Sequence, residues 1–268
     1  MNGESLETSW ALRYGSVPPE GADPSLAVYL RHRSVRRFTA KPISEGLLAT
    51  LVAAAQSAAT SSNLQLWSMV SVDEPDRRSA IARMAGEQAQ ISHAARFLVF
   101  VADHTRIRYA AAQAGLRAEG LDYQEFATMA VIDAALAAER LVVAAEAAGL
   151  GICYIGAVRN DPAGVAALLE LPEGTFAPFG LCLGWPDPAH PAEIKPRLSQ
   201  EAVWFRERYN PAPPVAEYDA RMRAFYESQS MKGDVTWSMR SARRVDGQHM
   251  TGREILLDWL HRMGFARR

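Results

Sequence analysis

The sequence predicts a layered domain of the α+β class, with an α/β arrangement as the alternative, followed by a helical C-terminal extension. Three observations lead to this prediction. An alanine-rich run from Phe126 to Ala148 contains almost no helix breakers and gives the strongest helix of the chain. Four short apolar runs have the length and composition of buried strands. After Gly184 the sequence pattern changes: prolines at 186, 188, 191 and 196 indicate an irregular stretch, and helical patterns resume after it.

The N-terminal part is expected to be a loose arm over residues 1–24, because Pro18, Pro19, Gly21 and Pro24 interrupt any period. A single domain is predicted to fill 25–268, with the helical extension from about residue 210. A helix is expected to start at Ser25 and to run toward His32. Ser44 is the predicted N-cap of the next helix, whose apolar face consists of Leu47, Leu48, Leu51, Val52 and Ala55.

The remaining elements follow from the same patterns. Strands are predicted over 67–72, 97–102, 152–155 and 179–183, and helices over 76–84, 163–169, 214–228, 235–243 and 253–263. The small-residue stripe of 126–148 lets two helix backbones approach closely, as in the core of a dimer. An ordinary buried helix fits that pattern equally well.

Composition excludes several classes of protein. The 268 residues carry 29 basic and 30 acidic side chains, which argues against a nucleic-acid-binding protein. The longest apolar candidate, 127–150, contains four charged residues and is unsuited to a membrane. The first 25 residues lack the pattern of a signal peptide. Cys153 and Cys182 lie in apolar segments and are expected to be buried thiols. We therefore expect a cytoplasmic protein of a reducing compartment.

Several kinds of active site are not supported. Gly149-Leu150-Gly151 lacks the third glycine of a dinucleotide fingerprint and lies between a helix and a strand, the wrong order for that turn. The sequence has no phosphate-binding Gly-Lys-Ser/Thr loop, no metal-ligand spacing and no serine-nucleophile elbow. No metal site is therefore predicted, and the chemistry is expected to belong to a bound organic cofactor.

Two basic clusters stand out as candidates for binding that cofactor. In His32-Arg33-Ser34-Val35-Arg36, the two arginines are three apart, so at a helix end both guanidinium groups could clamp a phosphate monoester. From the local sequence alone, a basic helix C-terminus that complements the helix dipole is the first explanation of this cluster. The second cluster, Lys195-Pro196-Arg197, holds one of only three lysines. Its extended backbone would place a cation near a flavin ring, although a surface turn is the commoner explanation.

Two uncharged segments extend this interpretation. Thr60-Ser61-Ser62-Asn63 offers small polar side chains that could bond a sugar alcohol chain, or simply close a helix. Tyr154-Ile155-Gly156 ends a predicted strand with a residue that lacks a Cβ. Such a position lets a planar ring press against the backbone, while a bulge or turn is the alternative.

Taken in order, these segments resemble the FMN-dependent, oxygen-insensitive NADPH nitroreductase and flavin reductase family, of the major type. The resemblance runs from about His32 to the C-terminus. Besides the first cluster with Phe38-Thr39, it rests on Ser61-Ser62-Asn63-Leu64-Gln65, Gly149-Leu150-Gly151, Arg159-Asn160, and the string from Phe179-Gly180 through Gly184-Trp185-Pro186 to Lys195-Pro196-Arg197-Leu198.

The resemblance implies a mixed sheet wrapped by helices, in an intertwined homodimer with FMN at the subunit interface. His32, Arg33, Ser34 and Arg36 would hold the phosphate and ribityl chain, and Lys195 and Arg197 would lie near the ring and phosphate. Gln88 would lie beside the flavin, Tyr154, Ile155, Gly156 and Ala157 along one ring face, and Thr60 and Ser62 would come from the partner chain.

The implied reaction is a ping-pong cycle in which hydride passes from NADPH, with NADH as the alternative donor, through flavin N5 to a nitroaromatic, quinone or related small acceptor. No side chain is needed as a general acid or base, so no catalytic residue is predicted. Lys232 and Arg253 are the expected contacts for the nicotinamide donor.

Two departures from the family pattern bear on these expectations. Ala157 replaces a common second glycine, and Gln229 stands where an arginine for the 2′-phosphate of NADPH is expected. Fewer charge-assisted bonds to that phosphate predict a reduced preference for NADPH. A flavin or quinone reductase with incidental nitro activity is the alternative within the enzymes, and a protein that holds FMN without useful turnover is the alternative outside them.

Overall fold

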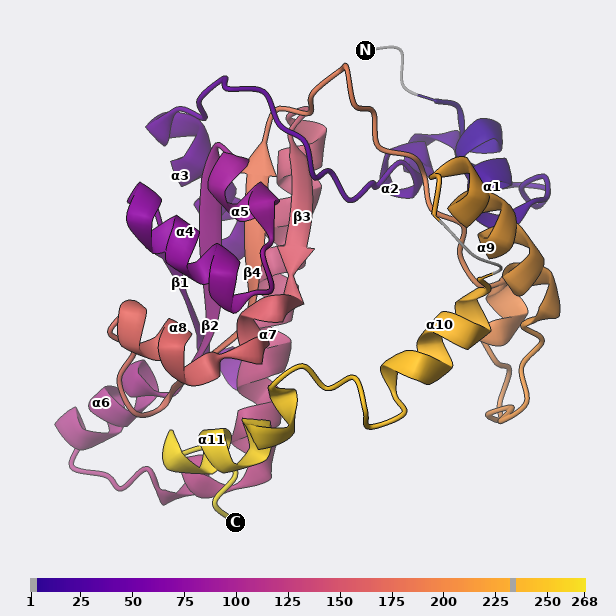
Figure 1. Ribbon diagram of the computed structural model, residues 1–268. Helices are drawn as coiled ribbons and strands as arrows, with labels where there is room; N and C mark the ends of the chain where they lie inside the picture. The colour runs from indigo at the N-terminus through magenta and orange to yellow at the C-terminus, as the bar shows by residue number, and fades with distance from the viewer. Residues whose placement is uncertain (1–3, 232–234) are drawn as a thin grey trace. The chain divides into compact units, whose positions relative to one another are not determined.

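The computed structural model describes residues 4–231 and 235–268 (Figure 1). Within these ranges the chain forms two compact units. Unit 1 contains the described residues up to Arg33 and those of Ala192–Met250, and unit 2 contains Ser34–Pro191 and Thr251–Arg268. The sequence-based division into an arm and a single domain stays a prediction.

Unit 2 is built on a four-stranded antiparallel sheet in the order β1-β2-β4-β3. The strands are β1 (Trp67–Ser71), β2 (Arg96–Asp103), β3 (Gly151–Ile155) and β4 (Thr175–Gly184). All four predicted strands are confirmed, and β4 starts at Thr175 rather than at Phe179 because its pairing with β2 resumes beyond an irregularity in register. The predicted thiols, Cys153 and Cys182, lie opposite each other on β3 and β4, and both are free and buried.

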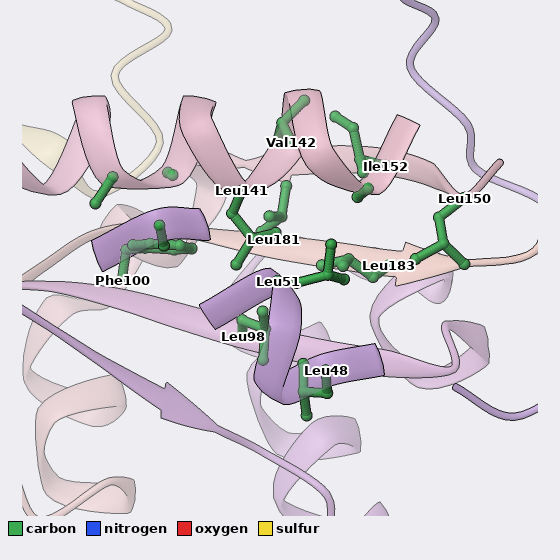
Figure 2. Close-up of a cluster of buried hydrophobic side chains, with 14 of the residues drawn as sticks. Leu48, Leu51, Leu98, Phe100, Leu141, Val142, Leu150, Ile152, Leu181 and Leu183 are labelled. Carbon is green, nitrogen blue, oxygen red and sulfur yellow. The ribbon is translucent and has the colours of Figure 1, made fainter. Parts of the chain in front are cut away.

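Helices cover both faces of the sheet, as the alternation of side chains along β2 shows. Leu98 and Phe100 pack on one face with α3 (Glu45–Gln56) and α7 (Gln124–Ala147), as Figure 2 shows. Phe97, Val99 and Val101 point to the other face, against α4 (Pro75–Met84), α5 (Ala89–His93) and α8 (Pro162–Leu168). Successive side chains of a strand point to opposite faces, so β2 contributes to two hydrophobic layers. The α+β class is confirmed.

The predicted central helix is α7, and its small residues allow it to lie close to the sheet. Alanines at 130, 134, 137, 138 and 145 are fully buried, and Leu141 and Val142 pack among the leucines of the strands (Figure 2). The helix ends at Ala147, and Gly149 follows in a left-handed conformation with φ of 83°. At α3, the predicted cap is confirmed, since the Leu47 N–H donates to Ser44 Oγ at 3.2 Å.

The other elements of unit 2 lie around the C-terminal end of β2. They are α6 (Thr105–Gln113), η3 (Glu119–Asp122), η4 (Gly156–Asn160), η6 (Arg253–Ile255), α11 (Leu256–Arg262) and, before β1 in the chain, the short η2 (Ser61–Asn63). Phe265, beyond α11, is buried with its ring centroid 4.4 Å from that of His104. Helices α5 and α6 were not predicted from the sequence. Across the described residues, no helix combines the length and apolar character that a membrane span requires.

Unit 1 contains a helix in the N-terminal segment that the sequence pattern predicts to be irregular. Residues Leu6–Tyr14 form the helix α1, which Ser5 caps by accepting from the Thr8 N–H at 3.2 Å and which Gly15 ends with φ of 71°. Leu6, Ser9 and Arg13 are its buried residues, at the spacing of one helix face. The rest of unit 1 comprises η1 (Pro24–Leu26), α2 (Ala27–Leu30), η5 (Gln200–Ala202), α9 (Ala216–Ser228) and α10 (Trp237–Arg244).

Candidate functional site

The first basic cluster does not end a helix, contrary to the prediction. Helix α2 stops at Leu30, and residues 32–37 form an extended segment rather than a helical turn. Arg33 donates from Nη2 to Glu4 Oε1 at 2.6 Å and from Nη1 to the Arg31 carbonyl at 3.1 Å. Arg36 is exposed, and its Nη1 lies 3.4 Å from the Ser34 carbonyl oxygen. Alignment of both guanidinium groups by a helix end is therefore wrong.

Arg13 of α1 joins the two basic clusters within unit 1. Its guanidinium donates to the carbonyl oxygens of Leu30 at 3.0 Å, His32 at 2.5 Å and Lys195 at 2.7 Å. The side chain is 4% exposed, so these bonds form away from bulk water. His32 and Lys195 are 163 positions apart in the chain (195 − 32), and one buried side chain brings their backbones together.

Within unit 1, hydrogen bonds with α1 and α9 hold the backbone of the Lys195-Pro196-Arg197 segment. The Arg197 N–H donates to the Arg13 carbonyl at 2.8 Å, which ties the segment to α1. From α9, Tyr218 Oη donates to the Pro196 carbonyl at 3.3 Å and Arg221 Nη2 to the Arg197 carbonyl at 3.1 Å. Lys195 is partly exposed and Arg197 exposed, while Pro196 between them is buried. Hydrogen bonds from α1 and α9 thus fix the backbone that carries the two cationic side chains.

In unit 2, Ser34 lies against the edge strand of the sheet. It forms a parallel bridge with Ile152 of β3, and the Val35 N–H donates to the Ile152 carbonyl at 2.8 Å. This isolated bridge is parallel, whereas β1 to β4 pair antiparallel. The glycine at 151 is required for the approach, because a Cβ there would lie 2.6 Å from Val35 Cγ2. The Gly149-Leu150-Gly151 motif therefore ends α7 and admits the Ser34 segment to β3.

The same strand leads to the predicted ring-binding segment. Tyr154, 36% exposed, donates from its hydroxyl to Glu139 Oε2 at 3.2 Å. Burial of the hydroxyl, with the Glu139 carboxylate beside it, raises the pKa of Tyr154. Ile155 is buried, and Gly156 and Ala157 begin η4, both partly exposed. A Cβ at Gly156 would lie 3.3 Å from Arg159 Nη2, a close but not excluded contact with the end of a long side chain.

The Thr60–Gln65 loop is fixed by a residue that the sequence did not single out. Asp133 of α7, fully buried, accepts from the Ser61 N–H at 2.9 Å and from the Leu66 N–H at 3.0 Å. Three loop residues have left-handed backbones, with φ of 50° at Ser62, 55° at Asn63 and 52° at Gln65. Such conformations are costly for residues other than glycine, so the loop depends on the carboxylate that binds both of its ends.

Three further residues were predicted to contact flavin or donor. Gln88 precedes α5, is partly buried, and accepts at Oε1 from Gln90 Nε2 at 2.6 Å. Arg253 donates from Nε to Asn160 Oδ1 at 2.8 Å, which joins the C-terminal segment to the end of η4. Lys232 lies outside the described residues.

Of the predicted residues, unit 1 brings together His32, Arg33, Lys195 and Arg197. Unit 2 places Ser34 beside β3, whose end carries Tyr154, Ile155 and Gly156, and Arg253 beside η4. The structure gives no direct contact of Thr60, Ser62 or Gln88 with these groups. The sequence reasoning missed Arg13, Glu4 and Asp133. The available signal for Asp133 was its place on the alanine face of the helix, at helical spacing from Ala130 and Ala137.

Known protein families and sequences match this chain over most of its length. The model of the "Nitroreductase family" matches residues 29–185, and that of its "C-terminal domain" matches residues 195–268. The "NADPH-flavin oxidoreductase" of Vibrio harveyi is 36% identical over 247 residues, covering 91% of this chain and 99% of that protein. The "Oxygen-insensitive NADPH nitroreductase" of Salmonella typhimurium is 34% identical over 249 residues, covering 91% and 99%.

Solved structures agree with these matches. A nitroreductase from Bacillus subtilis superposes with a TM-score of 0.85 at 33% identity, covering 91% of this chain and all of that one. The NADPH:FMN oxidoreductase of Vibrio harveyi, solved with NAD+, gives a TM-score of 0.81 at 34% identity, covering 91% and 99%. Since the family models match most of the chain, and the relatives are matched over nearly their whole length, the protein belongs to the nitroreductase family.

Proposed function

We propose that this protein is an FMN-dependent NAD(P)H oxidoreductase that reduces electron-poor small molecules such as nitroaromatics and quinones. The observation that carries the proposal is the anchoring of His32 and Lys195 by the buried Arg13. It gathers, in one compact unit, the two basic segments that the family resemblance assigns to FMN. The names of the relatives, an NADPH-flavin oxidoreductase and an FMN reductase (NADPH), support the same activity.

The residues present in unit 1 fit a phosphate monoester. Arg33, Lys195 and Arg197 supply cationic donors, and the backbone that carries them is fixed before a ligand arrives. Guanidinium groups bind phosphate oxygens in pairs, and a fixed site loses less entropy on binding. Arg33 pairs with the Glu4 carboxylate at 2.6 Å, and its guanidinium has the donor geometry that a phosphate also accepts. In this proposal His32, Arg33, Ser34 and Arg36 hold the phosphate and ribityl chain, and Lys195 and Arg197 lie near the ring and phosphate.

The residues of unit 2 fit a flat apolar ring. At the end of β3, the buried Ile155 is followed by Gly156, which has no side chain and leaves its backbone open to a flat ring. We assign Tyr154 through Ala157 to one face of the flavin, Gln88 to its edge, and Thr60 and Ser62 to contacts made across a homodimer. FMN, when bound, would supply the hydride-transfer chemistry of the proposed ping-pong cycle between nicotinamide and acceptor. The side chains bind and orient, and none is assigned a proton-transfer step.

Arg253 is the residue we assign to the nicotinamide donor. It is held at Asn160, at the end of the helical turn that Gly156 begins, and is partly exposed. Lys232 is assigned to the same role from the sequence. Since Gln229 replaces an expected arginine, the preference for NADPH over NADH is proposed to be weak. Comparing kcat/KM for both donors tests this, and a strong preference for NADPH would contradict it.

The proposed assembly is a homodimer, which α7 supports. Val131, Ile132 and Leu136 of this central helix are 38%, 45% and 44% exposed in the single chain. Apolar residues on one stripe of a helix that is otherwise core indicate a contact with a second copy. Light scattering after gel filtration should give twice the chain mass, and a monomer would contradict the assembly. We also propose that the protein is located in the cytoplasm.

The activity is tested by purifying the protein, identifying its flavin by chromatography, and measuring turnover with NADPH and NADH. Acceptors would include a nitroaromatic, a quinone and free FMN. Bound FMN with turnover of at least one acceptor is expected. Bound FMN without turnover by either donor would favour the alternative, a protein that holds FMN without reducing an acceptor. Gln229, in place of the expected arginine, is the sequence feature that supports this alternative. A protein that binds no FMN would contradict the proposal.

A further inference from the structure

The N-terminal helix α1 precedes the region that resembles the family. The family models begin at residue 29 and continue, apart from 186–194, to the last residue. The relatives are matched over 99% of their length but cover 91% of this chain. The family models therefore do not cover α1, Leu6–Tyr14, and with it Arg13.

Arg13 binds the backbone of both segments that the proposed function assigns to FMN. Its Nη2 contacts the His32 carbonyl and its Nη1 the Lys195 carbonyl, at 2.5 and 2.7 Å, while Nε contacts the Leu30 carbonyl at 3.0 Å. In return, the Arg13 carbonyl accepts from the Arg197 N–H at 2.8 Å. A planar guanidinium presents its donors in fixed directions, so these bonds set the separation of the two segments as well as their attachment.

A second contact of the same N-terminal segment reaches the cluster directly. The Glu4 carbonyl accepts from both Nε and Nη2 of Arg31, and the Glu4 carboxylate binds Arg33. The segment from Glu4 to Arg13 thus fixes backbone at 32 and 195 and one side chain at 33. Each of these contacts lies within unit 1.

We propose that Arg13 is a positioning residue for FMN: by holding His32 and Lys195 at a fixed separation, it organises the cations that recognise the phosphate. The inference rests on the proposed function. Ligand affinity depends on how much of the site is ordered before binding, so loss of Arg13 should weaken FMN more than a flavin without phosphate. Riboflavin is that flavin, since it shares the ring and ribityl chain.

The test uses the full-length protein freed of flavin. Dissociation constants for FMN and riboflavin are measured by quenching of flavin fluorescence in wild type, Arg13→Met and Arg13→Lys. Arg78→Met is the matched control, because Arg78 is also a buried arginine, donating to the carbonyls of Val72, Ala94 and Ala95. It makes none of these contacts to a residue assigned to FMN. Thermal unfolding of each variant is recorded alongside.

We expect Arg13→Met to raise the Kd for FMN about tenfold or more, and that for riboflavin by less than about threefold. Arg13→Lys should fall between, since an ammonium keeps the charge but not the planar fork. Arg78→Met should leave the ratio of the two constants at its wild-type value. If Arg13→Met does not fold, Arg13→Lys is compared with wild type on the same ratio.

An unchanged ratio of FMN to riboflavin affinity in the Arg13 variants would overturn the inference, as would an equal change in Arg78→Met. If the wild-type protein itself binds no FMN, the proposed function fails instead. The two failures are therefore distinguishable.

Discussion

Asp133→Asn is expected to loosen the Thr60–Gln65 loop and to destabilise the fold. The buried carboxylate accepts from two backbone donors, the Ser61 and Leu66 N–H groups, at 2.9 and 3.0 Å. Asparagine has the same shape but only one acceptor oxygen, so its NH2 group would face one of those donors. A hydrogen bond to a charged group contributes about 1.5–3 kcal/mol, and an unsatisfied buried donor costs about 1–3 kcal/mol. We therefore expect the free energy of unfolding to fall by about 2–4 kcal/mol.

Urea unfolding at equilibrium measures this change, and hydrogen exchange locates it. The Ser61 and Leu66 amides should exchange much faster in the variant, while amides within β2 follow the global change in stability. Glu125→Gln is the control on the same helix, since Glu125 is exposed, and its effect should stay within about 0.5 kcal/mol. Wild-type stability with unchanged protection of both amides would refute the assigned role of Asp133.

Three further changes test other parts of the structure. Gly151→Ala places a Cβ 2.6 Å from Val35 and should lower the free energy of unfolding by about 1–3 kcal/mol, as measured by urea titration. Adding Val35→Ala should restore part of that stability, and no recovery would refute the steric explanation. Burial lowers the pKa of His104, so the unfolded chain takes up its proton first as the pH drops below about 6.5. Stability should therefore fall from that pH toward the lowered folded-state pKa. His104→Gln should flatten this part of a plot of Tm against pH, and an identical slope would contradict the assignment. Ser44→Ala should remove the cap of α3 at about 1 kcal/mol, and a change within error of zero would contradict it.

Much of unit 2 could be predicted from local pattern. The central helix α7, the four strands and the Ser44 cap follow from periodicity, β-branched content and a capping residue, which act over a few neighbouring positions. Helix α1 was missed because its buried face carries Ser9 and Arg13 in place of apolar residues. The prolines and glycine from Pro18 onward then made the whole segment look irregular.

The arrangement of the candidate site was less accessible to sequence. The identities of His32 and Lys195 could be proposed from the family resemblance, but their anchoring depends on Arg13, which is 182 positions from Lys195. The helix-end geometry assumed for Arg33 and Arg36 was wrong, because α2 ends at Leu30 and the chain then extends toward β3. Long-range hydrogen bonds to backbone carbonyls leave no periodic signal, since any residue supplies the acceptor.

Anaerobic stopped-flow absorbance of the purified holoprotein tests the central claim most directly. NADPH, and in a separate experiment NADH, would be mixed with the protein while the absorbance at about 450 nm is followed. This band reports the oxidised flavin ring. The account predicts rapid bleaching with at least one donor, and recovery of the band when a nitroaromatic or a quinone is added. A band that neither donor bleaches, or a protein without any flavin, would contradict it.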